Sequence, residues 1–249
     1  MTITTTHPIE NDLRGQRYSF VPRNALYISQ DLAAAWEQLQ TDWEALPPDD
    51  YLPDGGSYRF RRYGRVYFLP ATGELLPLPH ADYFQSRDIN QVTGGIIRKF
   101  APLLPESFDN SFLQTLIRFN FRHYPIDDAA MQTQPWQVDI HQVRIVAEPG
   151  QAGEPTPEGI HRDGAEFVTV HLAELANATG GQVTIYDNDR QPLYDLTLQA
   201  SMDTYLFLDP QVLHSVTPIQ SADGARPGVR SILTFDYHFW PELERPDAE

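Results

Sequence analysis

Apolar residues recur at helical spacing in the first half of the chain and at strand spacing in the second half. Residues 31–46 place apolar side chains three or four positions apart and end before Pro47 and Pro48, which cannot continue a helix. This pattern predicts a helix over 31–46. Two more helices are predicted over 91–104 and 107–124, where they would brace a sheet from outside.

Residues 58–68 mix aromatic and basic side chains around Gly64, a pattern typical of a hairpin or of two short strands with one buried face. The basic side chains of this run are expected to form a solvated face, because the chain as a whole is acidic. Both ends of the chain, 1–15 and 241–249, are expected to be frayed.

From Trp136 onward, short runs rich in β-branched and aromatic residues alternate with turn residues. The gaps between most runs are too short for helical crossovers, so antiparallel connections are expected. We predict a β-sandwich or jelly roll with these strands: 137–147, 166–172, 182–186, 196–198, 204–208, 214–218 and 229–237. The fold class is therefore mainly β with flanking helices, in one domain over 1–249, with a helical and hairpin extension (about 1–130) and a jelly-roll core (about 135–240).

The formal net charge of −16 excludes some partners, since a surface this acidic repels nucleic acid backbones and anionic lipid headgroups. No apolar run approaches the roughly 18 residues that cross a bilayer, and no basic, apolar leader stands at the start, so we expect a cytoplasmic protein without a membrane partner. The chain has no cysteine. Any metal must therefore be bound by His, Asp or Glu.

The most informative motif is His161-Arg162-Asp163, followed later by His214. In an extended chain residues i and i+2 point to the same side, so His161 and Asp163 can reach one ion. His214 follows a turn and can approach from another strand. Two imidazoles and one carboxylate leave positions open on an iron ion, which favours an oxygenase. Taken alone, the motif fits equally well a surface turn capped by Asp163.

Arg230 and Ser231 begin the last β-rich run. A planar guanidinium can bind a carboxylate through two parallel hydrogen bonds, and a serine hydroxyl can add a third. We expect Arg230 and Ser231 to anchor an acidic cosubstrate. The alternative for Arg230 is a salt bridge at the rim of the protein.

Four motifs together resemble the Fe(II)/2-oxoglutarate-dependent dioxygenases, and more narrowly the bacterial group that hydroxylates free aliphatic amino acids such as isoleucine and leucine. They are Gly159-Ile-His-Arg-Asp-Gly164, Asn177-Ala-Thr-Gly-Gly181, His214-Ser-Val-Thr-Pro218 and Gly228-Val-Arg-Ser-Ile-Leu-Thr-Phe-Asp-Tyr237. The resemblance covers the second half of the chain closely.

This resemblance implies a double-stranded β-helix, a cupin-like jelly roll, with Fe(II) bound by His161, Asp163 and His214. It also implies that Arg230 meets the far carboxylate of 2-oxoglutarate. The implied reaction uses O2, decarboxylates 2-oxoglutarate to succinate and CO2, and hydroxylates an aliphatic C–H of a free L-amino acid. The protein would contribute positioning and exclusion of water.

A free amino acid needs a cation for its carboxylate and an anion for its ammonium group. The candidates for these roles are Arg144, Arg162 and Glu166, each of which can equally be a surface residue. If Arg144 lies in a strand, the apolar residues Val143 and Ile145 favour the opposite face as the inner one.

Other polar and aromatic residues near these motifs are expected in the core. His171 is interpreted as a hydrogen-bonded core histidine and not as a metal ligand. Core packing is also expected for Tyr58, Phe60, Tyr67 and Tyr205, although these rings could line a pocket. The loop 148–158, rich in Glu, Pro and Gly, is expected to be a flexible flap beside the metal motif.

Three other functions fit the same residues. A jelly-roll module that binds a metal or sugar without turnover would consume no 2-oxoglutarate. A metal-dependent hydrolase or isomerase on the same barrel would need no oxygen. The third alternative keeps the dioxygenase chemistry but takes a peptide, a carrier-tethered residue or a natural-product intermediate as substrate.

Overall fold

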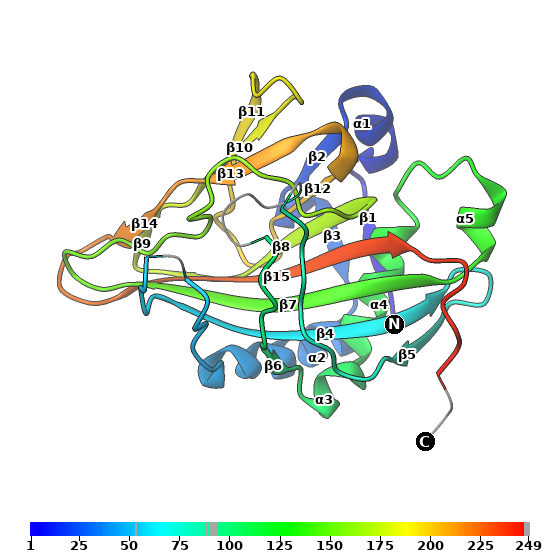
Figure 1. Ribbon diagram of the computed structural model, residues 1–249, viewed down its shortest axis with the longest axis horizontal. Coiled ribbons are helices and arrows are strands. Elements are labelled where there is room, and N and C mark those ends of the chain that lie inside the picture. Colours follow the sequence, from blue (N-terminus) through cyan, green and yellow to red (C-terminus); the bar gives the residue numbers. More distant parts are fainter. Residues whose placement is uncertain (53, 88, 90–93, 247–249) are drawn as a thin grey trace.

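A large antiparallel sheet forms the centre of the protein, as the computed structural model shows for residues 1–52, 54–87, 89 and 94–246 (Figure 1). Its strands follow the order β2-β12-β8-β15-β7-β4-β5, and β6 pairs with β4. A smaller sheet with the order β11-β10-β13 and a pair β14-β9 complete the jelly roll. The predicted fold class, mainly β with flanking helices, is confirmed.

The elements have these bounds in chain order. The N-terminal half contains β1 (Ile3–Thr5), α1 (Ile9–Gln16), β2 (Tyr18–Val21), η1 (Arg23–Ala25), β3 (Leu26–Ile28), α2 (Gln30–Gln40), η2 (Thr41–Ala45), β4 (Arg59–Leu69), β5 (Glu74–Pro77), β6 (Ala101–Pro102), α3 (Pro105–Phe108), α4 (Ser111–Phe121) and α5 (Ala129–Thr133). The C-terminal half contains β7 (Trp136–Ala147), β8 (Phe167–Ala176), β9 (Ala178–Gly180), β10 (Gln182–Tyr186), β11 (Pro192–Thr197), β12 (Thr204–Phe207), η3 (Asp209–Gln211), β13 (Leu213–Val216), β14 (Ile219–Ser221) and β15 (Gly228–Phe239).

The large sheet separates two hydrophobic cores. Helices α2 and α4 cover one face, where Trp36, Leu116 and Phe235 belong to one buried cluster (Figure 1). The small sheet covers the other face, where Val170 of β8 and Ile185 of β10 belong to a second cluster. Alternation along each strand therefore decides whether a side chain faces the helices or the space between the sheets.

The large sheet takes strands from both halves of the chain, because β2, β4 and β5 pair into it beside the C-terminal strands. The expected extension over about 1–130 is thus built into the core of the fold. A single domain over 1–249 remains our proposal. The helix predicted over 31–46 is confirmed as α2 followed by the 3-10 turn η2, and the helix over 107–124 as α3 and α4.

Three local predictions are wrong. The described part of 91–104 contains no helix, only β6, and residues 91–93 lie outside the described residues. The hairpin expected within 58–68 is one continuous strand, β4, whose hairpin partner is β5. The N-terminus is not frayed over 1–15, since β1 pairs with β3 and helix α1 buries Ile9 and Leu13.

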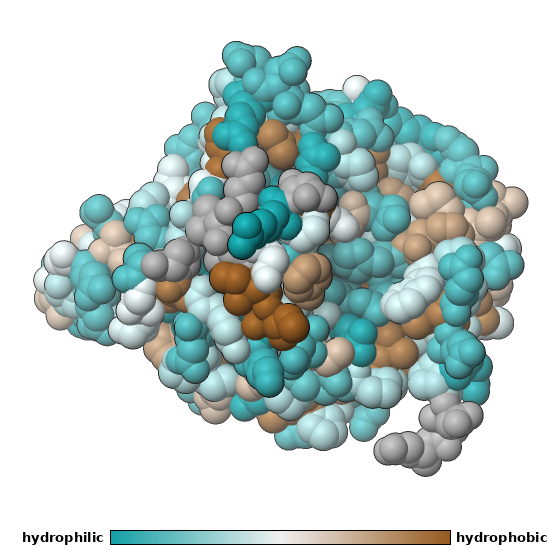
Figure 2. Space-filling model, in the orientation of Figure 1, coloured by the Kyte–Doolittle hydropathy of each residue, from teal (hydrophilic) through white to brown (hydrophobic). Residues whose placement is uncertain are grey.

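Most of the face in Figure 2 is hydrophilic, and hydrophobic residues gather near its middle. Exposed apolar side chains in the segment between β5 and β6 are Phe84, Ile96 and Ile97. In the part of the chain that the structure describes, no helix is long and apolar enough to cross a membrane.

Candidate active site

Two histidines of the predicted triad are paired through their backbones. His161 donates its N–H to the carbonyl of His214 at 3.0 Å, and His214 donates its N–H to the carbonyl of His161 at 2.9 Å. Residues that exchange both hydrogen bonds lie opposite each other and point their side chains to the same side. This pairing joins the loop before β8 to strand β13 of the small sheet.

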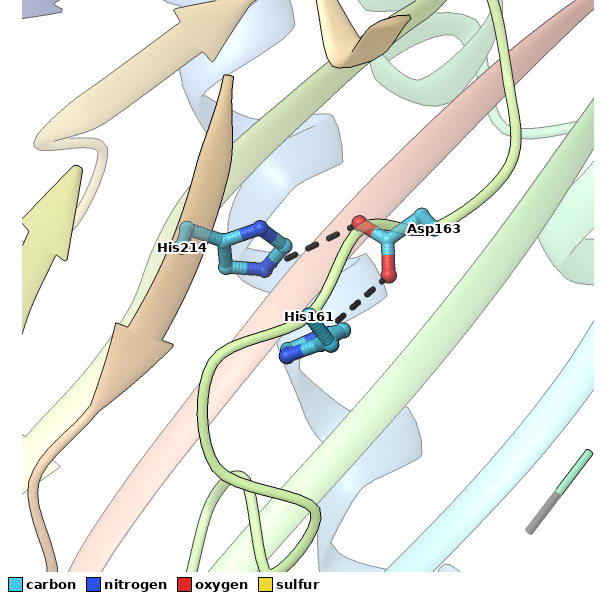
Figure 3. Close-up of side chains that lie close together, drawn as sticks. All are labelled: His161, Asp163 and His214. Carbon is cyan, nitrogen blue, oxygen red and sulfur yellow. Dashed lines mark ion pairs between the residues drawn. The ribbon is translucent and has the colours of Figure 1, made fainter. Parts of the chain in front are cut away.

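Asp163 completes the group from the same loop (Figure 3). Its two carboxylate oxygens lie 3.5 Å from His161 Nε2 and 3.8 Å from His214 Nε2. One ligand atom from each of the three residues lies within 4.8 Å of the others, so a single ion can contact all three. The structure brings together His161, Asp163 and His214, as the sequence predicted.

The orientation of the His161 ring suits a metal ligand. Its Nδ1 donates to the carbonyl of Gly159 at 3.1 Å, which leaves Nε2 directed at Asp163. Burial lowers the pKa of His161, but Asp163 and Glu158 outweigh this effect and raise the pKa to about 9. The protein without metal thus holds a proton where a divalent cation would bind, and metal binding would release that proton.

The opposite effect acts on His214. Burial and the positive charge of His161 lower its pKa to about 3, so this imidazole is neutral and ready to bind a metal. Burial raises the pKa of Asp163, but the imidazoles of His214 and His161 outweigh it and hold this pKa below its usual range. The donor set fits a divalent cation with two neutral imidazoles and one carboxylate.

Asp209, which the sequence analysis missed, fixes the loop that carries Asp163. Its carboxylate accepts hydrogen bonds from the backbone N–H groups of Asp163, Gly164 and Ala165 at 2.9, 2.7 and 3.2 Å. Burial raises the pKa of Asp209 to about 7, and the charge of Asp163 adds to this shift. In the sequence Asp209 is a single Asp before a proline, and this pattern does not predict that its carboxylate binds the backbone of a distant loop.

Arg230 lies in the same pocket as the triad and is 2% exposed. Neither terminal guanidinium nitrogen has a hydrogen-bond partner within the described residues. Gly181, with φ of +68°, makes room for it, because a Cβ there would lie 3.2 Å from Arg230 Cδ. Gly180 and Gly181 both have positive φ, as expected from the motif. The salt bridge at the rim, the alternative for Arg230, is absent among the described ion pairs.

Ser231 does not join Arg230. Residues next to each other in a strand point to opposite faces, and Ser231 lies on the helix side of β15, 3.4 Å from Glu174. The expected hydroxyl contact to an acidic cosubstrate is therefore corrected. Arg144 lies on the helix side as well, where it donates to the carbonyl of Trp43 at 3.0 Å. His141 and Val143 line the pocket instead, so the face expected to be the inner one is correct.

The other two substrate candidates also point away from the pocket. Arg162 donates to Asn188 Oδ1 at 2.7 Å, and Glu166 accepts from the backbone N–H of Phe239 at 3.0 Å. Neither residue is among those that line the pocket. We therefore withdraw Arg144, Arg162 and Glu166 as substrate-binding residues.

The remaining expectations divide between the core and the pocket. His171 is a core histidine, as interpreted, with Asn120 and Thr204 as partners at 3.0 and 2.6 Å. Tyr205 lines the pocket. Tyr58 and Tyr67 are buried, and Phe60 is partly buried against the core under the helices. The loop 148–158 is tied to β13 through Thr156 and Val216 at 2.9 Å, and its mobility remains a prediction.

A family model described as 2OG-Fe dioxygenase matches residues 40–236. The chain belongs to this family. It is an oxidoreductase, and the family uses Fe(II), 2-oxoglutarate and O2. The resemblance inferred from the four motifs is thereby confirmed.

Relatives of this dioxygenase include two named enzymes. It is 28% identical over 203 residues to the L-isoleucine-4-hydroxylase of Bacillus thuringiensis, covering 80% of this chain and 82% of that one. It is also 28% identical over 235 residues to the 3(1)-hydroxy-L-isoleucine 4-dioxygenase of Pantoea ananatis strain AJ13355, covering 90% and 93%. The crystal structure of a bsmA homologue from Methylobium petroleophilum PM1 superposes with a TM-score of 0.80 at 29% identity, covering 96% of this chain and 97% of that one.

The dioxygenase also carries pocket residues that sequence reasoning missed. The basic run on β4 was expected in solvent, yet Arg59 and Arg61 are only 6% and 9% exposed and line the pocket. Arg98 and Asp236 line it too, at 4% and 5% exposure. Strict alternation of Arg59, Arg61 and Tyr63 was the available signal, since side chains two apart in a strand share a face.

Proposed function

We propose that this dioxygenase hydroxylates an aliphatic C–H of a free L-amino acid of the leucine or isoleucine type and converts 2-oxoglutarate to succinate and CO2. The observation that carries the proposal is the placement of Arg230 in one pocket with the triad, where its buried terminal nitrogens have no hydrogen-bond partner among the described residues. An unpaired buried guanidinium is costly, so a carboxylate ligand is expected there. The names of the two curated relatives support the substrate class.

In this proposal His161, Asp163 and His214 hold Fe(II). Bound iron supplies the activation of O2 and the oxidation of the C–H bond. The backbone pairing of His161 and His214 keeps the two imidazoles in register. Arg230 would bind the far carboxylate of 2-oxoglutarate and so orient this cosubstrate. Val170, Val216 and Ile232 line the pocket around it and exclude water.

The test is an assay of succinate formation with Fe(II), 2-oxoglutarate and O2 and a panel of aliphatic L-amino acids. One of these amino acids should stimulate succinate formation and gain one oxygen atom by mass. His161→Ala should abolish both signals, because only two of the three ligands remain. Stimulation by peptides alone would assign the chemistry to a larger substrate, and no consumption of 2-oxoglutarate would leave a binding module.

A further inference from the structure

A row of three polar residues crosses the pocket floor beside the triad. Arg61 of β4 donates to His141 Nδ1 at 2.6 Å, and His141 Nε2 lies 3.3 Å from Asp236 Oδ2. Arg61 is always a donor, so Nδ1 of His141 is the acceptor and the ring proton sits on Nε2. Burial, with the positive charge of Arg61, holds the pKa of His141 well below its usual range. A neutral imidazole thus separates the Arg61 guanidinium from the Asp236 carboxyl group.

A second cation lies beside Arg61. The Arg61 guanidinium lies 3.8 Å from the centre of the Phe100 ring, and that of Arg98 lies 4.7 Å from the centre of the Tyr83 ring. Tyr83 and Phe100 contact each other, so both guanidinium groups pack on one aromatic surface. Arg98 donates to Gln85 Oε1 at 2.6 Å. Two buried positive charges therefore stand together on one side of the pocket.

These two charges have little compensation from the protein. Asp49 pairs with Arg59 at 2.7 Å and lies 3.9 Å from Arg61. Arg98 forms no ion pair with any described residue, and the buried Nε atoms of Arg61 and Arg98 have no hydrogen-bond partner there. Removing charged groups from water without a partner is costly. Arg61 and Arg98 are thus built to receive an anionic group.

The other end of the row is the acidic residue Asp236. Asp236 is 5% exposed, and the His141 ring is the one group recorded within ion-pair distance of its carboxyl among the described residues. Asp236 faces the pocket from β15, on the same side as Arg230 and Thr234. Burial and the charges of Asp163 and Asp139 raise the pKa of this carboxyl well above its usual range, and a cationic ligand group beside it would favour its ionised form.

We propose that Arg61 and Arg98 bind the α-carboxylate of the substrate and that Asp236 binds its α-ammonium group. This assignment rests on the proposed function and names how the site reads a free amino acid. One imidazole ring separates the two charges of the row, a spacing that the carboxylate and ammonium of one α-amino acid can bridge with ordinary hydrogen bonds. Both groups must be free, so amides and N-acylated amino acids are rejected.

The test is calorimetric binding to the anaerobic enzyme with Fe(II) and 2-oxoglutarate. The three probes are L-isoleucine, L-isoleucinamide and N-acetyl-L-isoleucine. In the wild type the free amino acid should bind about 10–100-fold more tightly than either derivative, as expected for loss of one charge-assisted contact. Arg98→Gln should reduce the preference for L-isoleucine over its amide about 10-fold and keep the preference over the N-acetyl derivative. Asp236→Asn should reduce the preference for L-isoleucine over its N-acetyl derivative and keep the preference over the amide.

Arg62→Gln is the matched control, because Arg62 is the neighbour of Arg61 on β4 and points to the other face, where it donates to the carbonyl of Pro102. It should leave both preferences unchanged. If circular dichroism shows that Arg98→Gln does not fold, Arg98→Lys is the second variant. It keeps the positive charge but loses the two parallel N–H donors of the guanidinium, so the preference for L-isoleucine over its amide should fall by less than about 10-fold. A separate loss of each preference cannot come from general damage to the pocket.

Unchanged preferences in Arg98→Gln and Asp236→Asn, with amino acid hydroxylation intact, would overturn this assignment and leave the proposed function standing. Equal binding of all three probes by the wild type would also overturn it. If the wild-type enzyme makes succinate from 2-oxoglutarate but binds no aliphatic amino acid, the proposed substrate class and this assignment fall together.

Discussion

Asp209 accepts a hydrogen bond from the backbone N–H of Asp163 at 2.9 Å, so a buried carboxylate positions the residue that supplies the carboxylate of the triad. The same carboxylate binds the next two N–H groups of the loop. Without Asp209, three backbone donors beside the triad would lose their acceptor. Asp209 thus orients Asp163 although Asp209 is not one of the proposed iron ligands.

Asp209→Ala should weaken Fe(II) binding about 10–100-fold, the usual cost of losing a residue that orients a metal ligand. Anaerobic isothermal titration calorimetry with Fe(II) measures the dissociation constant of the wild type and of the variant. Asp195→Ala is the control, because Asp195 lies in an exposed part of β11 and its carboxylate accepts a hydrogen bond from Thr184 Oγ1, outside the triad loop. Equal Fe(II) affinity of wild type and Asp209→Ala would mean that the loop keeps its shape without this carboxylate.

Arg230→Gln should raise the 2-oxoglutarate concentration needed for half-maximal turnover about 10–100-fold, since it removes a buried charge-assisted contact. The KM for the amino acid should change much less. Arg226→Gln, which alters an exposed ion pair with Asp223 near the start of the same strand, should leave the 2-oxoglutarate requirement unchanged. An unchanged requirement in Arg230→Gln would move the cosubstrate anchor elsewhere in the pocket.

Arg144→Gln should leave the KM values for the amino acid and for 2-oxoglutarate within about twofold of the wild type, because Arg144 faces the helices and bonds Trp43. A modest loss of stability, about 1 kcal/mol, is expected from the missing hydrogen bond. Steady-state kinetics and thermal unfolding measure the two effects. A large rise in the amino acid KM alone would return Arg144 to the substrate site.

The stability of the fold should fall in acid because of His171. Burial lowers the pKa of this histidine from 6.5 to about 3. Its contribution is fully present above the unfolded pKa and is lost as pH falls from there toward the folded pKa, because only the unfolded chain then takes up the proton. At pH 4.5 the loss is on the order of 3 kcal/mol.

Urea unfolding at pH 7.5 and pH 4.5 measures this effect. His171→Gln removes the titrating ring and should reduce the difference in unfolding free energy between the two pH values. His123, whose pKa burial lowers to about 4, remains in the variant and should retain part of the difference. The same pH dependence in wild type and His171→Gln would show that other groups govern acid unfolding.

The C-terminal strands could be predicted because alternation and turn residues are local properties. The strand predicted over 182–186 has those bounds in the structure, and the one over 229–237 is extended slightly at both ends in β15. The metal triad could also be predicted from the sequence, since His161 and Asp163 share a short motif. Their meeting with His214 follows from strand pairing, which local spacing alone does not determine.

Tertiary burial explains the errors. Arg59 and Arg61 looked solvated because arginine is seldom buried. Their face of β4 turns into the pocket only after β4 pairs with β7. Ser231 and Arg144 were expected in the binding site but lie on the other face of the sheet. Each is next in sequence to a residue that faces the pocket, and side chains alternate between the two faces of a strand. Asp209 serves backbone groups 44 to 46 positions away, a distance that no motif spans.

The backbone pairing of His161 with His214 has a consequence for which metal the cell's enzyme carries. Both imidazoles are set by main-chain hydrogen bonds, so the site has its shape before any ion arrives. Such a preformed set of two nitrogens and a carboxylate selects weakly among divalent ions, and affinity rises from Fe(II) through Co(II) and Ni(II). Competition from these tighter-binding ions, and the supply of iron, would then decide how much of the protein is active.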